Sequence, residues 1–155
     1  MSAATTGSAA LPRTPDWRAV EVGQRISSDE RLLDWQDVVL QVSGSQDWNR
    51  VHYDHQFAVD SGHREVFFNV GWTSATLSKL LTDWCGADGW LCELEFQMRR
   101  MISPGDTLTV RAEITGKRVE DGRGLVEFDV WLETDREGTT TPGRAVVALP
   151  IPRTE

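Results

Sequence analysis

Alternation of apolar and polar residues with a period of two runs through the second half of this chain and limits the folds open to it. Three runs show the pattern, at 92–99, 107–114 and 126–132. In each run one set of alternate residues is apolar and the other is mostly polar, as in strands whose sheet buries one face. A fourth apolar run, at 145–149, completes the series. The pattern predicts a sheet of several strands.

Turn-forming sequences separate these runs. Residues 103–106 read Ser-Pro-Gly-Asp and residues 121–124 read Asp-Gly-Arg-Gly, and these residue types favour the backbone angles of tight turns. A third turn region is predicted from Asp135 to Gly143. Short turns between successive strands predict a long antiparallel meander.

A helical pattern precedes the strands, at 71–84. Its apolar residues Leu77, Leu80, Leu81 and Trp84 recur at steps of three and four, which is the spacing of one face of a helix. One helix followed by a meander predicts an α+β domain of two layers, in which the antiparallel sheet covers the helix. A β-sandwich with a helical insertion is the alternative arrangement for the same pattern.

Shorter segments complete the layout. A short helix is predicted over 54–61 and is closed by Gly62. The apolar run at 38–42 fits a strand or the end of a short helix, because periodicity does not separate the two over so few residues. Residues 1–15 are small and polar and are expected to form a flexible tail, which leaves 16–155 as a single domain.

Charge and apolar content exclude several classes of protein. The chain carries 24 acidic residues against 16 Lys and Arg, a net charge of −8, which argues against a nucleic-acid-binding face. It has no apolar stretch long enough to span a membrane, and its first residues lack the features of a secretory signal. The expected location is the cytoplasm. The two cysteines, Cys85 and Cys92, form neither a disulfide framework nor a metal motif.

The turn-rich segment 43–65 is dense in side chains that can do chemistry. Asp47 and His52 stand on either side of a short turn, and a carboxylate beside an imidazole can deprotonate a water and protonate a neighbouring carbon. Asn49 lies between them and would orient the pair or cap a helix. The plainer interpretation is that Asp47 and Asn49 only cap a helix while His52 lies at the surface.

A metal site is a further interpretation of this segment. Asp47, His52, Asp54 and His55 are residue types that bind metals. The two histidines are three residues apart, and no third strong ligand follows at a diagnostic spacing. No metal is therefore expected.

Gly71 stands just before the helical pattern. A glycine there lets a substrate approach the backbone, and free N–H groups at the start of a helix can hold a developing oxyanion. The alternative is that Gly71 is an ordinary turn residue.

Three stretches together resemble the MaoC-like enoyl-thioester hydratases and dehydratases. Residues 45–54, with Ala58 and Gly62 after them, resemble the pattern Gly-Asp-x-Asn-Pro-x-His-x-Asp and the Ala and Gly that follow it. Residues 68–72 resemble the segment that opens the central helix of this family, and residues 103–108 resemble its Pro-Gly-Asp turn before a long strand. The stretches occur in the family's order.

The resemblance implies a single hot-dog fold, an antiparallel sheet wrapped around a long central helix. It implies reversible hydration of a 2-enoyl thioester, or dehydration of a 3-hydroxyacyl thioester, carried by coenzyme A or an acyl carrier protein. Asp47 and His52 match the catalytic pair, Asn49 the orienting residue, and the Gly71 backbone N–H the oxyanion donor. No cofactor is implied, because the thioester itself makes the α-proton acidic. A homodimer, or a heterodimer with a related hot-dog chain, is also implied.

The chain departs from the family pattern in three places. Gln46 stands where Gly is usual, Arg50 where Pro is usual, and Val70 where a His often precedes the Gly. None of these changes removes a proposed catalytic group, so we expect them to affect which substrate is used and how efficiently it is turned over. Residues 83–90 resemble small actinobacterial members that act on bulky acyl-CoA, including steroid side chains.

Further predictions concern contacts with the substrate. Trp48, Trp72 and Ser74 are close to the site in sequence and are predicted to line an acyl pocket, although Ser74 could instead bond to a helix carbonyl. Arg99 and Arg100 are predicted to contact the phosphates of coenzyme A or phosphopantetheine, with an exposed strand end as the alternative.

Three rival functions stay open beside the hydratase. A hot-dog thioesterase typically places an acidic residue on the helix, where only Asp83 occurs, at the far end. A non-catalytic or partner-dependent subunit of a heteromeric hydratase is the second rival. A polyketide-tailoring dehydratase or cyclase is the third.

Overall fold

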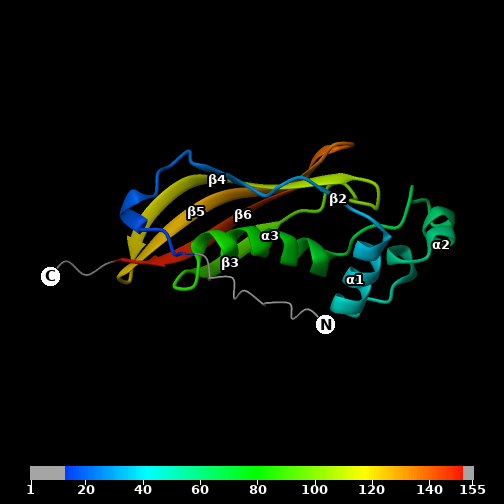
Figure 1. The fold of residues 1–155 in the computed structure, drawn as a ribbon, viewed down its shortest axis with the longest axis horizontal. Helices are drawn as coiled ribbons and strands as arrows, with labels where there is room; N and C mark the ends of the chain where they lie inside the picture. The colour runs from blue at the N-terminus through cyan, green and yellow to red at the C-terminus, as the bar shows by residue number, and fades with distance from the viewer. Residues whose placement is uncertain (1–12, 152–155) are drawn as a thin grey trace, which may run out of the picture.

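One long helix, α3, lies along a curved sheet, and α1 and α2 lie toward one end of the molecule (Figure 1). The computed structural model describes residues 13–151. The strands follow the order β1-β4-β5-β6-β3, β2 also pairs with β4, and every pairing is antiparallel. In chain order the elements are η1 (Trp17–Ala19), β1 (Arg25–Ser27), β2 (Arg31–Leu32), α1 (Trp35–Ser45), η2 (Arg50–His52), α2 (His55–Asp60), α3 (Val70–Cys85), β3 (Trp90–Phe96), β4 (Thr107–Glu120), β5 (Arg123–Thr134) and β6 (Gly138–Pro150).

Helix α3 buries one face against the sheet. Its buried residues recur every four positions: Thr73, Leu77, Leu81 and Cys85. Alternate residues of the strands meet this face, and those of β5 are Val126, Phe128, Val130 and Leu132. Each large apolar side chain removed from water stabilises the fold by roughly 1.5–3 kcal/mol. The predicted α+β arrangement of two layers is confirmed, and the β-sandwich alternative is not adopted.

Capping residues define the ends of α3. The Asn69 side chain accepts a hydrogen bond from the Trp72 N–H at the start of the helix. Gly86 ends it with a positive φ of 68°, and its own N–H donates to the Thr82 carbonyl. The helix predicted over 71–84 is therefore confirmed, with one further residue at each end.

The turn region predicted from Asp135 to Gly143 is wrong over most of its length. Strand β6 begins at Gly138, so only 135–137 connect it to β5. Thr140 and Thr141 are buried within β6, and the Thr140 hydroxyl donates to the Leu132 carbonyl. A run of threonines is polar enough to look like a loop, but their branched side chains suit a strand.

Cys92 also differs from its predicted position on the apolar face of its strand. The pairing of β3 with β6 shifts between Leu91 and Glu93, which is the mark of a bulge. Leu91 packs against the core, and Cys92 is exposed. A single extra residue reverses which side chains face the core, and alternation alone does not reveal it.

The apolar run at 38–42 lies in helix α1. A capping box starts this helix: the Asp34 carboxylate accepts the N–H groups of Gln36 and Asp37, and the Asp37 carboxylate accepts the Asp34 N–H. These caps provide partners for N–H groups that have none within the helix, and they favour a helix over a strand for the run that follows. Helix α2 confirms the short helix predicted over 54–61, with Asp54 and Ser61 as its caps.

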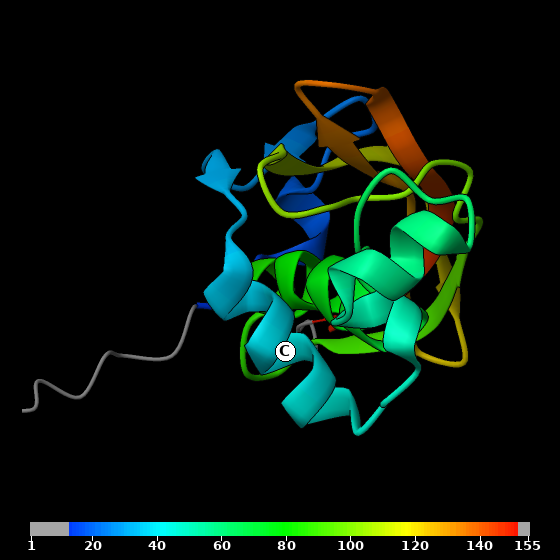
Figure 2. The same ribbon diagram turned by 90° about the vertical axis from the view of Figure 1, so that its right-hand side faces the viewer.

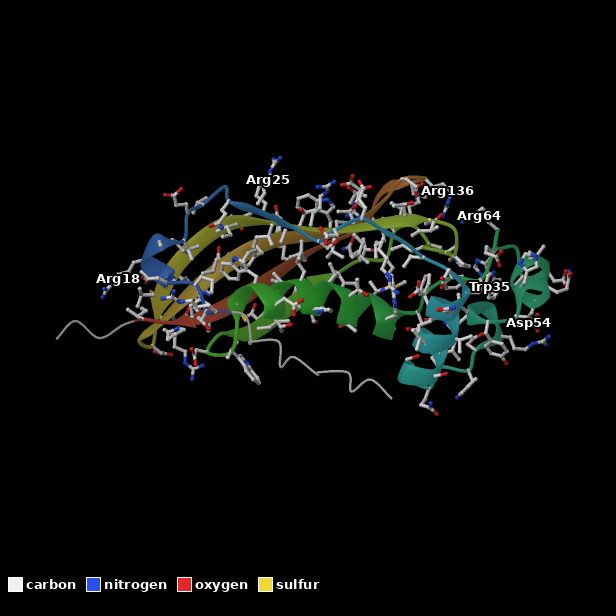
Figure 3. All side chains as sticks on the ribbon, in the orientation of Figure 1. Arg18, Arg25, Trp35, Asp54, Arg64 and Arg136 are labelled. Carbon is white, nitrogen blue, oxygen red and sulfur yellow. The ribbon has the colours of Figure 1, made fainter. Side chains whose placement is uncertain are left out.

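Helices α1 and α2 lie together at the end of the molecule where α3 begins (Figure 2). Figure 3 places Trp35, Asp54, Arg64 and Arg136 at this end and Arg18 at the opposite one. These are called the site end and the far end below. No helix among residues 13–151 is long and apolar enough to cross a membrane. The tail predicted for 1–15 lies, apart from 13–15, outside the described residues.

Candidate active site

The chain reverses direction directly after α1, and this reversal presents Asp47. Gln46 caps the helix in the left-handed conformation, with φ of 55° and a side-chain hydrogen bond to the Ser43 carbonyl. This conformation favours glycine, which is the residue that the resembled family usually has here. Gln46 therefore keeps the chain reversal while departing from the family pattern.

Asp47 and His52 face each other. The Asp47 Oδ2 lies 3.3 Å from the His52 Nε2, and the other imidazole nitrogen, Nδ1, lies 2.8 Å from the Phe67 carbonyl oxygen. Because a carbonyl only accepts, Nδ1 carries a proton and Nε2 is left to exchange one beside the Asp47 carboxylate. The His52 side chain is 10% exposed and that of Asp47 is 40% exposed. The pair therefore combines a fixed imidazole with a carboxylate that solvent or a ligand can reach.

Asn49 holds the turn that carries His52. Its side chain accepts the Val51 N–H and caps η2, while its own N–H donates to the Asp47 Oδ1. Of the roles predicted for Asn49, the structure shows the cap, together with this backbone link to Asp47. The side chain of Asn49 therefore acts on the geometry of the turn.

Arg50, which replaces the usual Pro, takes part in a second brace of the same turn. Its Nε and Nη2 donate to the Asp54 Oδ2 at 3.1 and 2.7 Å, and its guanidinium lies 4.3 Å from the centre of the Phe57 ring. The hydrogen bond from Arg50 holds the pKa of Asp54 below its ordinary value. The Arg50–Asp54 ion pair thus restrains a turn that the resembled family stiffens with the ring of a proline.

The loop at 61–69 supplies the carbonyl that orients His52, and it is anchored to the turn before β4. The Phe68 N–H donates to the Ile102 carbonyl at 2.9 Å, and the Arg64 Nη2 lies 3.4 Å from the Asp106 Oδ1. The loop that carries the partner of His52 is therefore held by the turn before β4, in addition to its bonds with the site segment.

Asp106 is the buried centre of that anchor. Its carboxylate accepts the Ser103 N–H and two hydrogen bonds from Arg136, at 2.7 and 2.8 Å. Burial acts to raise the pKa of Asp106, but the hydrogen bonds from Arg136 and from the Ser103 N–H lower it overall, below its ordinary value of 3.8. The carboxylate therefore stays charged in the folded protein at neutral pH.

Gly71 brings the start of α3 against the end of α1. It is exposed, and a Cβ added to it would lie 3.5 Å from the Cβ of Ser45, two residues before Asp47. As the second residue of the helix, its N–H has no acceptor within the helix. An N–H donor and the positive end of a helix dipole thus lie beside the Asp47 segment.

The residues predicted to line an acyl pocket have different surroundings. Trp48 is 58% exposed, and its ring meets the edge of Tyr53 at 6.2 Å. Trp72 lies against Phe68 at 4.2 Å and joins the core, and Ser74 is half-buried on α3. The structure therefore gives Trp72 a packing role, and a pocket role stays a prediction for all three.

Arg99 and Arg100 lie exposed beyond the end of β3. The Arg99 guanidinium bonds to the Gln97 Oε1, and the Arg100 Nε lies 3.7 Å from the Glu137 Oε2. Arg136 donates to the Met101 carbonyl, which ties this segment to the site end. A role in binding phosphates stays a prediction for both arginines.

Sequence reasoning missed two polar residues of α1 that contact the site. The Gln41 side chain bonds to backbone groups of His52 and Asn69, and the Ser45 hydroxyl bonds to the Asp47 N–H and the Asn69 side chain. The available signal was a glutamine within an otherwise apolar run, with a serine one helical turn later.

Comparison with known proteins identifies a family and a set of similar structures. The profile of the family described as "MaoC like domain" matches residues 18–135. The beta subunit of 3-oxo-4,17-pregnadiene-20-carboxyl-CoA hydratase from Mycobacterium tuberculosis is 26% identical over 85 residues, which are 55% of this chain and 64% of that protein. The match thus spans less than two thirds of the relative's length.

Solved structures show the same fold. The ChsH1-ChsH2 complex from M. tuberculosis has a chain that superposes with a TM-score of 0.74 at 22% identity, over 83% of this chain and 98% of that one. The (R)-hydratase from A. caviae involved in PHA biosynthesis has a TM-score of 0.76 at 22% identity, over 86% and 99%. These likenesses confirm the predicted hot-dog fold. Since the family profile covers most of the chain, this protein belongs to the MaoC like domain family.

Proposed function

We propose that this protein catalyses the reversible hydration of a 2-enoyl thioester to a 3-hydroxyacyl thioester, carried by coenzyme A or phosphopantetheine. The observation that carries the proposal is the contact between Asp47 and His52, 3.3 Å between Oδ2 and Nε2, beside the exposed start of α3. Membership of the family and the hydratases among the related proteins support the same reaction.

In the hydration direction the pair moves protons. As the oxygen of a water bonds to C3 of the enoyl group, the Asp47–His52 pair removes a proton from that water. The electrons of the C2–C3 double bond move toward the thioester carbonyl, and the pair returns a proton to C2. The hydrogen bond from Nδ1 to the Phe67 carbonyl keeps Nε2 directed at the reacting atoms. Dehydration is the same path in reverse.

The start of α3 stabilises the enolate that forms between these steps. Negative charge develops on the thioester oxygen, and the Gly71 N–H and the helix dipole would hold it there. The acidity of the α-proton comes from the thioester, so the proposed reaction needs no cofactor. Removing a single donor of this kind slows acyl chemistry by about a hundredfold or more in other enzymes.

We further propose that the working form is a dimer, of this chain with itself or with a related hot-dog chain. Strand β3 is an edge of the sheet among the described residues, and Trp90 in it is 69% exposed. Asp47 and Gly71 are accessible in the single chain, so a second chain would help to exclude water from them. The beta-subunit name of the curated relative and the two-chain complex support a partner.

The first test is turnover of purified protein with short, long and polycyclic trans-2-enoyl-CoA substrates. Asp47→Asn and His52→Ala are each expected to lower turnover by at least about a hundredfold, the usual scale for a lost general acid or base. Asp83→Asn is the matched control, because Asp83 pairs with Lys79 at the exposed far part of α3 and should leave turnover unchanged. Wild-type turnover in Asp47→Asn or His52→Ala would disprove the proposal.

A partner-dependent subunit is the second candidate, and the exposure of the site in one chain favours it. In that case the isolated chain is inactive, and adding a related chain restores turnover. If Asp47→Asn then abolishes the activity of the complex, this chain carries the chemistry. If the complex keeps full turnover with Asp47→Asn, the partner carries the chemistry and this chain is the non-catalytic subunit.

A further inference from the structure

Gln41 lies between the two parts of the candidate site and bonds to both. Its Nε2 donates to the His52 carbonyl oxygen at 3.3 Å, and its Oε1 accepts the Asn69 N–H at 3.0 Å. One amide thus links the turn that carries His52 to the residue that caps α3. Gln41 is 4% exposed, so these bonds form away from water.

The orientation of this amide follows from its partners. The His52 carbonyl can only accept and the Asn69 N–H can only donate, so the amide nitrogen must face His52 and the oxygen must face Asn69. A buried amide with both partners satisfied restricts the geometry strongly, because loss of either partner leaves a polar group unpaired.

Ser45, one helical turn later on α1, makes a second link of the same kind. Its hydroxyl donates to the Gln41 carbonyl at 2.6 Å and accepts the Asp47 N–H at 3.3 Å and the Asn69 Nδ2 at 2.7 Å. Gln41 and Ser45 therefore lie on one face of the helix and contact Asp47, His52 and Asn69.

We infer that Gln41 and Ser45 are positioning residues, which set the distance between the Asp47–His52 pair and the oxyanion donor at the start of α3. The inference rests on the proposed function. Gln41 acts through backbone groups of His52 and Asn69, and Ser45 acts through the Asp47 N–H and the Asn69 side chain. Their loss should therefore lower kcat and leave KM nearly unchanged, because substrate binding far from the reacting bond is not altered.

The main test replaces Gln41 by methionine, which keeps the length of the side chain and removes both hydrogen bonds. Gln41→Met is expected to lower kcat by about tenfold or more, since small misplacement of reacting groups costs rate steeply. Gln36→Met is the matched control, because Gln36 is an exposed glutamine on the same helix. Ser45→Ala should likewise lower kcat, and Ser43→Ala, an exposed serine of the same helix, should not.

A second variant, Gln41→Glu, is tested by the pH dependence of its turnover, which a purely structural role of Gln41 would not change. An ionised Glu accepts the Asn69 N–H but has no proton for the His52 carbonyl, whereas a protonated Glu makes both bonds. Turnover of Gln41→Glu relative to wild type should therefore rise as the pH falls. The comparison is made with wild type because Asp37, Asp47 and His52 are present in both proteins. A ratio independent of pH would overturn the inference.

Failure of this inference is distinguishable from failure of the proposed function. If Asp47→Asn abolishes turnover but Gln41→Met keeps wild-type kcat, the inference fails and the function stands. If wild type and Asp47→Asn are equally inactive both alone and after a related chain is added, the proposed function fails. The inference is then tested by the ring ¹⁵N resonances of His52. Gln41→Met should shift these resonances and Gln36→Met should not, and unchanged resonances in Gln41→Met would overturn the inference.

Discussion

The two ends of helix α3 are held in different ways. Near its C-terminal end Leu81 and Cys85 are buried in the core, and the Trp84 ring meets the edge of Phe128 with 5.0 Å between ring centres. At its N-terminal end hydrogen bonds from Asn69 to Gln41 and Ser45 are added to the packing of Trp72 on Phe68, and Val70 and Gly71 are exposed.

The two ends of α3 therefore contribute different things, one mainly to the stability of the fold and the other mainly to the geometry of the site. Apolar contacts are non-directional and depend on the area removed from water, so they stabilise the helix without fixing its N-terminus closely. Hydrogen bonds contribute less free energy each but demand a particular distance and angle. The far end therefore supplies more of the stability, and the site end sets the positions of the groups that would react.

The largest expected effect on stability comes from the far part of α3. Leu81→Ala should lower the free energy of unfolding by about 3 kcal/mol, through lost apolar burial and the cavity left behind. Leu32→Ala is the matched control, because Leu32 is 65% exposed and should change stability little. Urea denaturation measures both, and activity per folded molecule should stay at the wild-type level in both. If Leu81→Ala lowers the free energy of unfolding by less than half of this value, the far end of α3 does not supply most of its stability.

An intermediate effect is expected at the anchor of the loop that orients His52. Arg136→Met leaves the buried Asp106 carboxylate with Arg64 as its remaining cationic partner, at 3.4 Å, and should cost about 2 kcal/mol at neutral pH. The exposed pair of Arg144 and Asp129 provides the control variant Arg144→Met, which should cost little.

The acid dependence of this effect has a definite sign. The pKa of Asp106 is lowered in the folded protein, although burial acts to raise it, because Arg136 and the Ser103 N–H bond to the carboxylate. Its stabilisation is therefore present above the ordinary value of 3.8 and is lost as the pH falls through the folded pKa. The stability difference between wild type and Arg136→Met should narrow in acid. A constant difference from neutral pH down to acid would show that Asp106 is not the group involved.

The smallest expected effect on stability, with a large effect on turnover, is at the start of α3. Asn69→Ala removes the helix cap and should lower the free energy of unfolding by about 1 kcal/mol. It also removes the bond to Ser45, so kcat should fall by about tenfold. Asp16→Ala removes the cap of η1 at the far end and should leave kcat unchanged. Equal kcat in wild type and Asn69→Ala would show that the site end does not set the reacting geometry.

Much of the scaffold was predictable from local pattern. The helix over 71–84 and the antiparallel strands follow from apolar periodicity, which reports the face that each element buries. Two predictions were wrong: Thr140 and Thr141 look like loop residues but lie within β6, and a bulge turns Cys92 away from the core. In both places the pairing with a neighbouring strand determines which side chains are buried, and the local sequence does not show that pairing.

For the site, the sequence alone determined the residue types that can do the chemistry. Asp47, Asn49 and His52 were identified from their spacing and from the family resemblance, and Gly71 from its place before the helix. Five residues of extended chain can span roughly 17 Å, so their spacing allows Asp47 and His52 to meet but does not require it. The 3.3 Å contact between them comes from the folded turn.

Only the tertiary structure decided how these groups are held. Gln41 precedes Asn69 by 28 residues, and His52 precedes Phe67 by 15, so their contacts depend on how α1, the loop at 61–69 and α3 pack together. A buried amide is recognised by the partners that surround it, and those partners are assembled only when distant segments meet. The residues proposed for the chemistry are therefore close together in the sequence, and their alignment depends on the packing of elements that are remote in the chain.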